Sequence, residues 1–591
     1  MDQVYGGFEL LFQYQRSFDA SNLARGLFGT NVLNFAGSAV VGAATNALLA
    51  DNFGLSSNFV GSIALKPVIQ SFNLGFDWFI GLDEWARGLY LQIDGNFEAQ
   101  KRELQSNCSY ITSTTYGNIP FPAGYMSSTS TAPISPITDI PTALGLQGTF
   151  GDKKTAGTFG RFDFCDRTES GFAGLSVNLG YDFVRCDNYF LGAFFRVVAP
   201  TGSKVHPEYV FNPIVGNGQG WEVGAGISSR WEMWNNNDCQ KLTAMLDGYV
   251  VSILKHRSLR TFDLASTNTA FQVNYLCNNS ENNNCNAGCS VASCNTGCSV
   301  ASCNAGSSVD SCNATNGCNI SPCSTGCNTG CNSCAAANSL SRYSLLKQFN
   351  LVGGVYTYAS NLITAADYTT RSVDVRTPVK GDATVRIVYT HGGFDFGFGY
   401  NVFGMSREKI SAVGAASSCL FTSTTTAYGL KGCQCAGYDV YSTSFIGTTT
   451  VINALTSVSP LNSTASNATA YQNGCGTCGT MDNPAVITSV PANTFYTSCT
   501  TTATAGTLVS SLTPASASDP VVLLSGTVND LDLCSGTAPR QYSSKGFISL
   551  DYTWEDNDWA PFLGFIAEVE GGSRNLDLAQ WGVVIRGGVS Y

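Results

Sequence analysis

The chain has 591 residues and a formal net charge of −11, and only 12% of its residues are Asp, Glu, Lys or Arg, about half the usual share. So little charge argues against a large water-soluble protein, and the acidic balance offers no basic patch to a nucleic acid. No apolar run reaches the roughly 18 residues that a membrane-spanning helix needs. If the chain crosses a membrane, it must therefore do so with strands, since a closed barrel is the other structure that satisfies every backbone hydrogen bond in lipid.

The start of the chain and its cysteines bear on the compartment. Residues 1 to 16 show no charged segment followed by an apolar one, as a signal peptide would. The 23 cysteines are a load sustained mainly where disulfides persist, so we expect a chain that begins after removal of a signal peptide. Their odd number leaves at least one thiol unpaired or paired with another chain.

Apolar and polar residues alternate with a period of two in many segments. Between Leu175 and Phe183, for example, Leu, Val, Leu, Tyr and Phe alternate with Ser, Asn, Gly and Asp. Such segments of about ten residues are typical of tilted strands that cross a membrane. We predict an all-β protein, a closed antiparallel transmembrane β-barrel of about fourteen strands within a range of roughly 12 to 16. The expected strands are 4–14, 72–81, 88–98, 172–184, 188–199, 220–234, 240–252, 343–359, 362–375, 383–390, 393–404, 545–555, 561–570 and 580–591.

The connections between these strands sort by length. The short ones are 82–87, 185–187, 235–239, 360–361, 391–392 and 556–560, and the long ones are 15–71, 99–171, 200–219, 253–342 and 405–544. Short turns on one side and long loops on the other are typical of outer-membrane barrels, with the turns in the periplasm and the loops outside the cell. An even strand count places both termini on the turn side, so the strand that ends at Tyr591 should pair with the strand from Tyr5 to Tyr14.

Two further patterns indicate a lipid-facing surface. The last strand places Trp581, Val583 and Ile585 on one face and Gly582 and Arg586 on the other. All eight tryptophans fall at strand ends, which is where an indole at the headgroup level would lie. Trp78, Trp85, Trp231, Trp234, Trp554 and Trp559 are at the turn end, and Trp221 and Trp581 are at the loop end.

These segments together resemble bacterial outer-membrane β-barrels. The segments Phe396–Ile410 and Trp559–Gly564 are, more narrowly, similar to large porin-like major surface proteins of host-associated intracellular bacteria. The resemblance implies an outer membrane as the surrounding lipid, loops at the cell surface, passive diffusion of solutes and a homo-oligomer, with a trimer as the expected form. The cysteine-rich segment has no counterpart in this resemblance.

Charged residues on the expected inner faces are the candidate pore lining. They are Asp77, Asp94, Glu98, Asp182, Arg196, Glu222, Arg230, Asp247, Arg386, Asp395, Asp551, Glu568 and Arg586, together with Glu232 and Lys241. Acids predominate, and rings of such charges set the ionic preference of a pore. The alternative is that these groups pair with each other across the interior and set no preference.

The cysteines concentrate in two of the long loops. The candidates for disulfides are Cys277, Cys285, Cys289, Cys294, Cys298, Cys303, Cys312, Cys318, Cys323, Cys327, Cys331 and Cys334 in loop 253–342, and Cys419, Cys433, Cys435, Cys475, Cys478, Cys499 and Cys534 in loop 405–544. Asn, Gly and Ser between the cysteines cannot build an apolar core, so order would come from cross-links within or between chains. Metal binding by clustered thiolates is the alternative. However, none of the three histidines lies between Cys277 and Cys334, and the cysteine spacing departs from zinc-finger patterns.

The segment 19–50, within loop 15–71, begins with a candidate helix cap at Asp19 or Ser21 and could form a partial helix that plugs the pore or packs among the loops. The three histidines lie outside any catalytic motif, so we expect no enzyme and no cofactor. The leading hypothesis is a diffusion channel for small polar solutes and ions beneath a disulfide-stapled extracellular cap. The alternative is a structural or adhesive surface protein that forms a coat or lattice without significant transport. A ligand-specific transporter would need an apolar pocket beneath segment 19–50.

Overall fold

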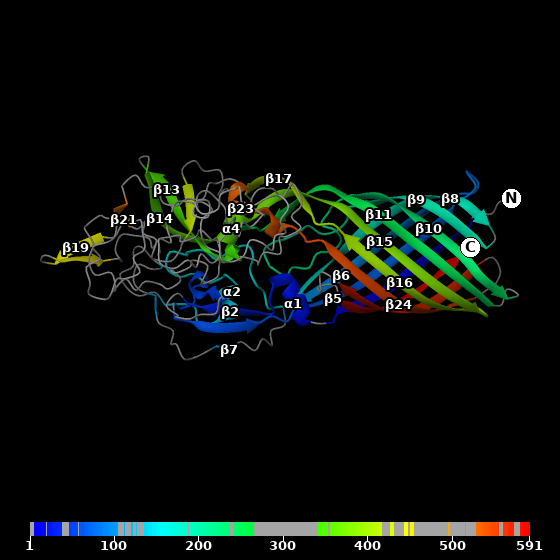
Figure 1. Ribbon diagram of the computed structural model, residues 1–591, viewed down its shortest axis with the longest axis horizontal. Helices are drawn as coiled ribbons and strands as arrows, with labels where there is room; N and C mark the ends of the chain where they lie inside the picture. Colours follow the sequence, from blue (N-terminus) through cyan, green and yellow to red (C-terminus); the bar gives the residue numbers. More distant parts are fainter. Residues whose placement is uncertain are drawn as a thin grey trace, which may run out of the picture.

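The computed structural model describes residues 5–18, 20–37, 47–56, 58–104, 111–112, 120–121, 126, 135–186, 188–236, 240–264, 340–352, 355–416, 426–430, 442–446, 449–453, 495–496, 514–515, 528–554, 559–572 and 579–591. Most of its regular structure is β, and it has two parts: a long barrel and a region of loops, short strands and short helices at one end of it (Figure 1). None of the helices described is long or apolar enough to cross a membrane.

The barrel is a closed antiparallel sheet, as predicted. Its strands are β1 (Gly6–Ser17), β5 (Val68–Gly81), β6 (Leu89–Glu103), β8 (Arg167–Cys186), β9 (Tyr189–Ala199), β10 (Glu222–Asn236), β11 (Gln240–Arg260), β15 (Arg371–His391), β16 (Phe394–Met405), β24 (Gln541–Thr553), β25 (Ala560–Gly572) and β26 (Gln580–Ser590). Each strand pairs with its neighbour in this order, and β26 pairs with β1 to close the cylinder. Both termini lie at the end with the short connections, which we call the turn end; the opposite end is the loop end (Figure 1). The predicted pairing of the first and last strands is confirmed.

Twelve strands close the barrel, at the lower limit of the predicted range, and the segments predicted at 343–359 and 362–375 are wrong as barrel strands. β13 (Leu345–Val352) and β14 (Val355–Thr364) instead form a separate three-stranded sheet with β18 (Thr426–Leu430) at the loop end. The helix α4 (Ala365–Thr369) follows, and β15 runs without interruption through the segment predicted at 383–390. The connection predicted at 360–361 therefore lies inside β14. Alternation of apolar and polar residues indicates a sheet with two different faces. Strands of a small sheet in a loop show this alternation as clearly as barrel strands do.

Outside the sheet, the barrel presents apolar side chains, and inside it presents polar ones. On β8, Leu179 is 51% exposed while its neighbour Asn178 is 2% exposed. On β26, Ile585 is exposed and Val584 is buried. Seven of the eight tryptophans, all but Trp581, have exposed side chains. A surface that is apolar over a closed sheet and polar within it has the arrangement required by lipid outside and water inside.

The loop end has an apolar core of its own. It contains α1 (Ala20–Phe28), η1 (Ala50–Phe53), α2 (Ile140–Leu144) and η6 (Ser341–Tyr343), and a four-stranded sheet of β2 (Val32–Ala36), β3 (Ala47–Leu49), β4 (Val60–Ala64) and β7 (Ile111–Thr112). Leu23 and Phe53 from one loop, Leu144 and Phe162 from a second and Tyr343 from a third pack into one cluster. Hydrophobic burial thus joins at least three of the loops to each other.

Several short elements complete the loop end. They are β12 (Asp263–Leu264), β17 (Lys409–Ala416), β19 (Ser442–Ile446), β20 (Thr449–Asn453), β21 (Phe495–Tyr496), β22 (Pro514–Ala515), η9 (Val528–Asp530), β23 (Leu531–Asp532) and η10 (Leu533–Gly536). β17 pairs with the outermost part of β15, so the barrel wall continues past its rim on that side. β12 pairs with β23, which brings two long loops together.

Candidate functional site

A cavity of about 1600 Å³ occupies the barrel interior. Its lining includes Tyr5, Arg185 and Asn188 at the turn end and Arg260 and Gln541 at the loop end. The walls between these ends are the inner faces of the barrel strands. The cavity therefore extends from one end of the barrel to the other.

Most of the predicted pore residues line this cavity. They are Asp77, Asp94, Glu98, Asp182, Arg196, Glu222, Arg230, Asp247 and Glu568, and Glu232 joins them. Arg386, Asp395, Asp551 and Arg586 do not line it, and neither does Lys241. The face of each strand could be read from alternation, but whether an inward side chain reaches free space depends on its neighbours across the sheet.

Ion pairs span the inner wall. Arg196 Nη1 on β9 lies 3.2 Å from Asp94 Oδ2 on β6, so this pair crosses the intervening strand β8. Lys380 Nζ on β15 lies 2.9 Å from Glu222 Oε1 on β10, across β11. Lys545 on β24 pairs with Glu568 on the adjacent strand β25 at 3.2 Å. These pairs neutralise part of the predicted charge of the lumen and connect strands of the wall.

Asp551 is the centre of a second, more buried group. Its carboxylate accepts two hydrogen bonds from Arg586 at 2.8 Å each and one from Arg386 Nη2 at 2.9 Å. Arg586 also lies 3.5 Å from Glu9 Oε1 on β1. A Cβ atom on Gly564 would collide with the Asp551 carboxylate, so glycine at this position leaves the space that the carboxylate fills.

Charge in the cavity is not fully balanced by these pairs. Among the described residues that line it, six acids and two arginines make no ion pair: Asp77, Glu98, Asp182, Glu232, Asp247 and Asp382, and Arg102 and Arg230. Several of the acids accept hydrogen bonds from neutral groups, such as Asn401 Nδ2 on Asp382 at 2.7 Å. The cavity thus keeps a negative excess.

The connection 200–221 folds back into the loop end of the cavity. Ile214, Gly216 and Asn217 line it, and Asn217 Nδ2 donates to Glu222 Oε1 at 2.9 Å. Gly216 and Gly218 have φ of +72° and +77°, a region that favours glycine. The predicted external loop 200–219 did not include this wall. The run Gly-Asn-Gly-Gln-Gly at 216–220 is the turn signal that could have indicated it.

The described residues of segment 19–50 do not plug the barrel. α1 and its neighbours pack in the loop-end core and none of them lines the barrel cavity. The cavity lined by Phe28, Leu33 and Leu48 of this segment and by residues of other loops, Arg342 among them, has a volume of about 60 Å³. A ligand pocket usually needs about 300 Å³ or more, so the described residues offer no site there for a transported apolar molecule.

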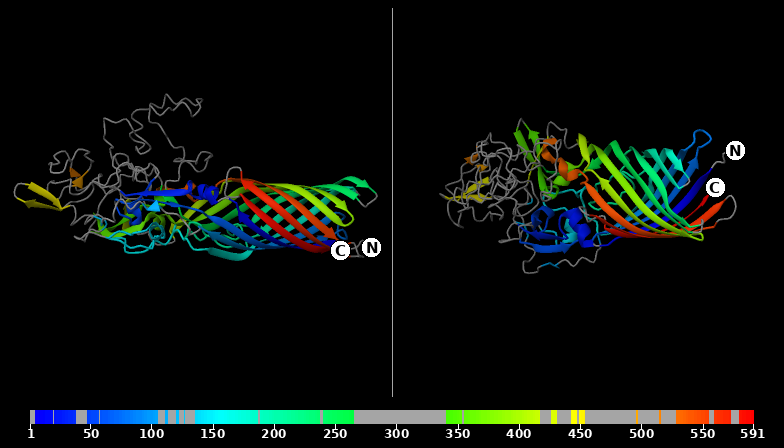
Figure 2. Two further views of the ribbon diagram at one scale, coloured as in Figure 1. Left: turned by 90° about the horizontal axis from the view of Figure 1, so that it is seen from below. Right: turned by 45° about the vertical axis from the view of Figure 1, so that its right-hand side comes forward.

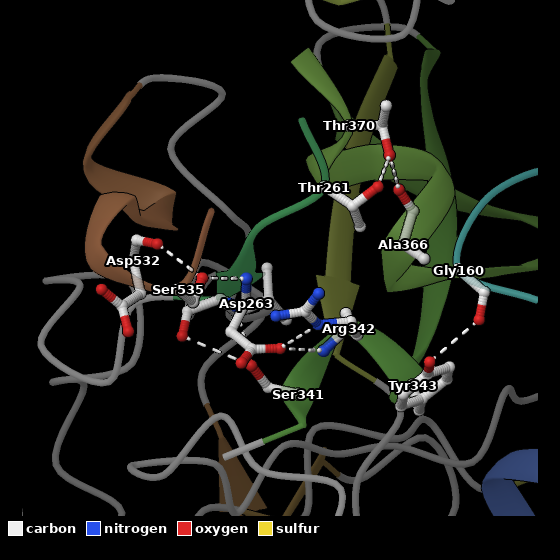
Figure 3. Close-up of polar contacts among 11 residues, drawn as sticks. Gly160, Thr261, Asp263, Ser341, Arg342, Tyr343, Ala366, Thr370, Asp532 and Ser535 are labelled. Carbon is white, nitrogen blue, oxygen red and sulfur yellow. Dashed lines mark hydrogen bonds and ion pairs between the residues drawn. The ribbon is translucent and has the colours of Figure 1, made fainter. Parts of the chain in front are cut away.

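The roots of the two cysteine-bearing loops meet in one polar cluster (Figure 3). Arg342 donates to Asp263 Oδ1 through Nε at 2.8 Å and through its backbone N at 3.1 Å. Ser341 Oγ accepts from Leu264 N at 2.7 Å, and Ser535 Oγ accepts from Asp263 N at the same distance. Burial alone would lower the pKa of Arg342, but its partner Asp263 raises that pKa above the ordinary value. Leu264 and Ser341, which flank the cysteine-bearing part of loop 253–342, are therefore in contact.

The predicted disulfides cannot be placed in this structure. The candidates from Cys277 to Cys334 and from Cys419 to Cys499 lie outside the described residues. Cys534 lies in η10, close to the root cluster. Cys165 and Cys186, which were not among the candidates, are exposed and free. Among the described residues, no group of three or more His, Cys, Asp or Glu side chains is placed to hold a metal ion.

No protein-family model matches the chain, and no curated protein matches its sequence. Among solved structures, an outer-membrane channel from Pseudomonas putida F1 has 9% identity and a TM-score of 0.32, over 99% of this chain and 96% of that one. A FadL homologue from Pseudomonas aeruginosa has 7% identity and a TM-score of 0.26, over 100% and 90%. The β domain of a Bordetella autotransporter has 6% identity and a TM-score of 0.26, over 99% and 100%.

Likeness at this level carries no functional argument, and the assignment of the chain rests on its own geometry. Its sheet is closed, its outer face is apolar, its inner face is polar, and its connections are short at one end and long at the other. These are the properties that a sheet needs in order to cross the outer membrane. The protein is a multi-pass β-barrel of the outer membrane, with its long loops at the cell surface.

Proposed function

We propose that the protein is a porin-like channel through which small polar solutes and ions diffuse passively. The observation that carries this proposal is the cavity whose lining includes residues from both ends of the barrel. Its walls present carboxylates, amides and arginines such as Asp247, Gln92 and Arg230, which water and ions can contact. The connection 200–221, where it enters the lumen, would limit the size of the solutes.

The negative excess in the cavity supports a weak preference for cations. Six lining acids stand without an ion pair, against two arginines, so a permeating cation meets more favourable charge than an anion does. The preference should be weak because Asp94, Glu222 and Glu568 are each neutralised by a basic partner.

Planar bilayers test the channel. Purified full-length protein should give stepwise conductance in potassium chloride, and the cavity should be reachable by a thiol reagent. Cys186 lines the turn end of the cavity as an exposed free thiol. A bulky charged methanethiosulfonate should therefore reduce the current, and Cys186→Ser should remove the effect that arises at this position. A protein that inserts into the bilayer but stays silent would overturn the proposal.

A second candidate is a structural surface protein, and one observation favours it. The loop end is a folded region with its own apolar core, which diffusion through the barrel does not itself require. With the predicted disulfides in loops 253–342 and 405–544, such a region would form a cross-linked cap or join neighbouring barrels, in trimers or in a lattice. Silent bilayers combined with loop-dependent association of purified chains would favour this function over the channel.

A further inference from the structure

Four aromatic residues alternate with glycines along one row of the inner wall. The backbone N of Gly81 on β5 donates a hydrogen bond to the carbonyl oxygen of Tyr5. Gly81 lies opposite Tyr90 on β6, and Tyr90 lies opposite Gly180 on β8. The row continues from Gly180 to Phe194 on β9, to Gly226 on β10 and to Tyr249 on β11. All four aromatic residues line the cavity.

The glycines hold the rings flat against the wall. A Cβ atom on Gly81 would collide with the ring of Tyr5, one on Gly180 with Tyr90, and one on Gly226 with Phe194. Each of these rings therefore covers a glycine on the next strand, an arrangement that protects the glycine backbone. It also keeps the rings from closing the lumen and turns their faces toward its axis.

The row also rises along the channel. Barrel strands tilt against the barrel axis, so residues paired across successive strands climb as they go round the wall (Figure 2). Gly81 is the last residue of β5 at the turn end, whereas Gly226 lies close to Glu222, the first residue of β10 at the loop end. A solute that moves through the cavity would pass these rings in turn.

Two of the rings already hold cations. The guanidinium of Arg185 lies 5.1 Å from the centre of the Tyr5 ring, and that of Arg196 lies 4.7 Å from the centre of the Tyr249 ring. Both distances are in the range of a cation–π interaction. Tyr90 is buried, which leaves Phe194 as the ring of the row with an accessible face and no described cation on it.

An uncompensated carboxylate lies near that ring. Asp247 faces the cavity, is exposed, and makes no ion pair among the described residues. It lies on β11, two residues from Tyr249, which is level with Phe194 in the row. Two strand spacings and two residue rises separate the Cα atoms of Phe194 and Asp247 by about 12 Å in a flat sheet. Both side chains point into the lumen, and a ring-bearing ammonium fits between them.

We propose that Phe194 and Asp247 form a binding site for organic cations, in which an ammonium group with apolar or aromatic substituents lies on the Phe194 face and is balanced by Asp247. The site rests on the proposed function to the extent that solutes must reach the lumen. It predicts preference for an organic cation over an inorganic cation, which lacks the apolar contact, and over a neutral ring, which lacks the charge.

Phenyltrimethylammonium is a suitable probe, with tetramethylammonium and benzyl alcohol as the matched compounds that lack the ring or the charge. The probe should block potassium current through the full-length protein at lower concentration than either compound. Phe194→Leu, which keeps an apolar side chain, should weaken the block about threefold to tenfold, and Asp247→Asn should weaken it comparably. Phe194→Tyr should retain it. Phe195→Leu is the control, since Phe195 is the next residue on β9 and faces lipid.

Calorimetry of probe binding in detergent separates this inference from the channel proposal. Normal conductance without block, with no heat of binding, would refute the site and leave the channel. Silent bilayers with Phe194-dependent heat of binding would refute the channel and support the site. Equal effects of Phe194→Leu and Phe195→Leu, or equal block by tetramethylammonium, would show that the carboxylates alone attract the probe and would overturn the inference.

Discussion

Asp551→Asn should destabilise the barrel more than the same change at any lumen carboxylate without an ion pair. Asp551 is 3% exposed and holds both Arg386 and Arg586 at 2.8 to 2.9 Å. Breaking a buried ion pair typically costs about 3 to 5 kcal/mol, because a charge is left without its partner. We expect the lower limit, about 3 kcal/mol, since the arginine side chains keep 16% and 19% exposure and Arg586 retains Glu9.

The assay is urea unfolding of the protein in lipid vesicles, followed by tryptophan fluorescence. A loss of about 3 kcal/mol should lower the urea midpoint by about 1 to 2 M. Asp247→Asn is the matched control, because Asp247 faces the lumen and has no ion pair to lose. Arg386→Gln completes a double-mutant cycle, in which the coupling with Asp551 should exceed about 1 kcal/mol. If Asp551→Asn and Asp247→Asn differ by less than about 0.5 kcal/mol, the reasoning about the buried group is wrong.

Three other outcomes are expected, two from the structure and one from the cysteine content of the sequence. Reversal potentials under a potassium chloride gradient should show weak cation preference that Asp247→Lys reduces or inverts, whereas an anion preference in the native protein would mean that the lining acids are compensated. Burial, and then the nearby Asp263 carboxylate, raise the pKa of Asp532 from 3.8, so its contribution to stability is present below pH 3.8 and is lost as the pH rises through the raised pKa. The urea midpoint at neutral pH minus the midpoint at acidic pH should therefore be more positive in Asp532→Asn than in the native chain. Non-reducing electrophoresis should show a faster monomer or higher oligomers that collapse on reduction, and a thiol count that finds most of the 23 cysteines free would contradict the stapled cap.

The barrel could be predicted from sequence because lipid and water impose opposite demands on neighbouring residues of one strand. Leu179 and Asn178 differ in exposure as their polarity requires. Ile585 and Val584 also differ in exposure although both are apolar, so their positions on the closing strand decide which of them meets lipid. Alternation could not separate the barrel strand β15 from the loop hairpin of β13 and β14, because both are two-faced sheets. That ambiguity accounts for the two surplus strands.

Order at the loop end was harder to foresee. Loops 253–342 and 405–544 carry twelve and seven cysteines, so cross-links were the expected source of order there. In the described part of the chain, the loops are joined instead by apolar side chains that are sparse in each segment, such as Leu23 from one loop, Phe162 from a second and Tyr343 from a third. A core assembled from distant segments leaves no local pattern in any of them. The predicted cross-links would therefore act on a region that already has a core.

The lumen shows why candidate residues can be found from sequence while their partners cannot. Inward position follows from alternation, but a pair such as Arg196 and Asp94 forms across an intervening strand and depends on register. Glycines then decide which groups can meet. Gly564 leaves room for the Asp551 carboxylate, and Gly226 leaves room for the Phe194 ring, so one residue type supports an ion pair in one place and an aromatic face in another. A glycine on the inner wall therefore leaves space for a side chain of the next strand. Which side chain fills that space can be determined only once the register of the barrel is known.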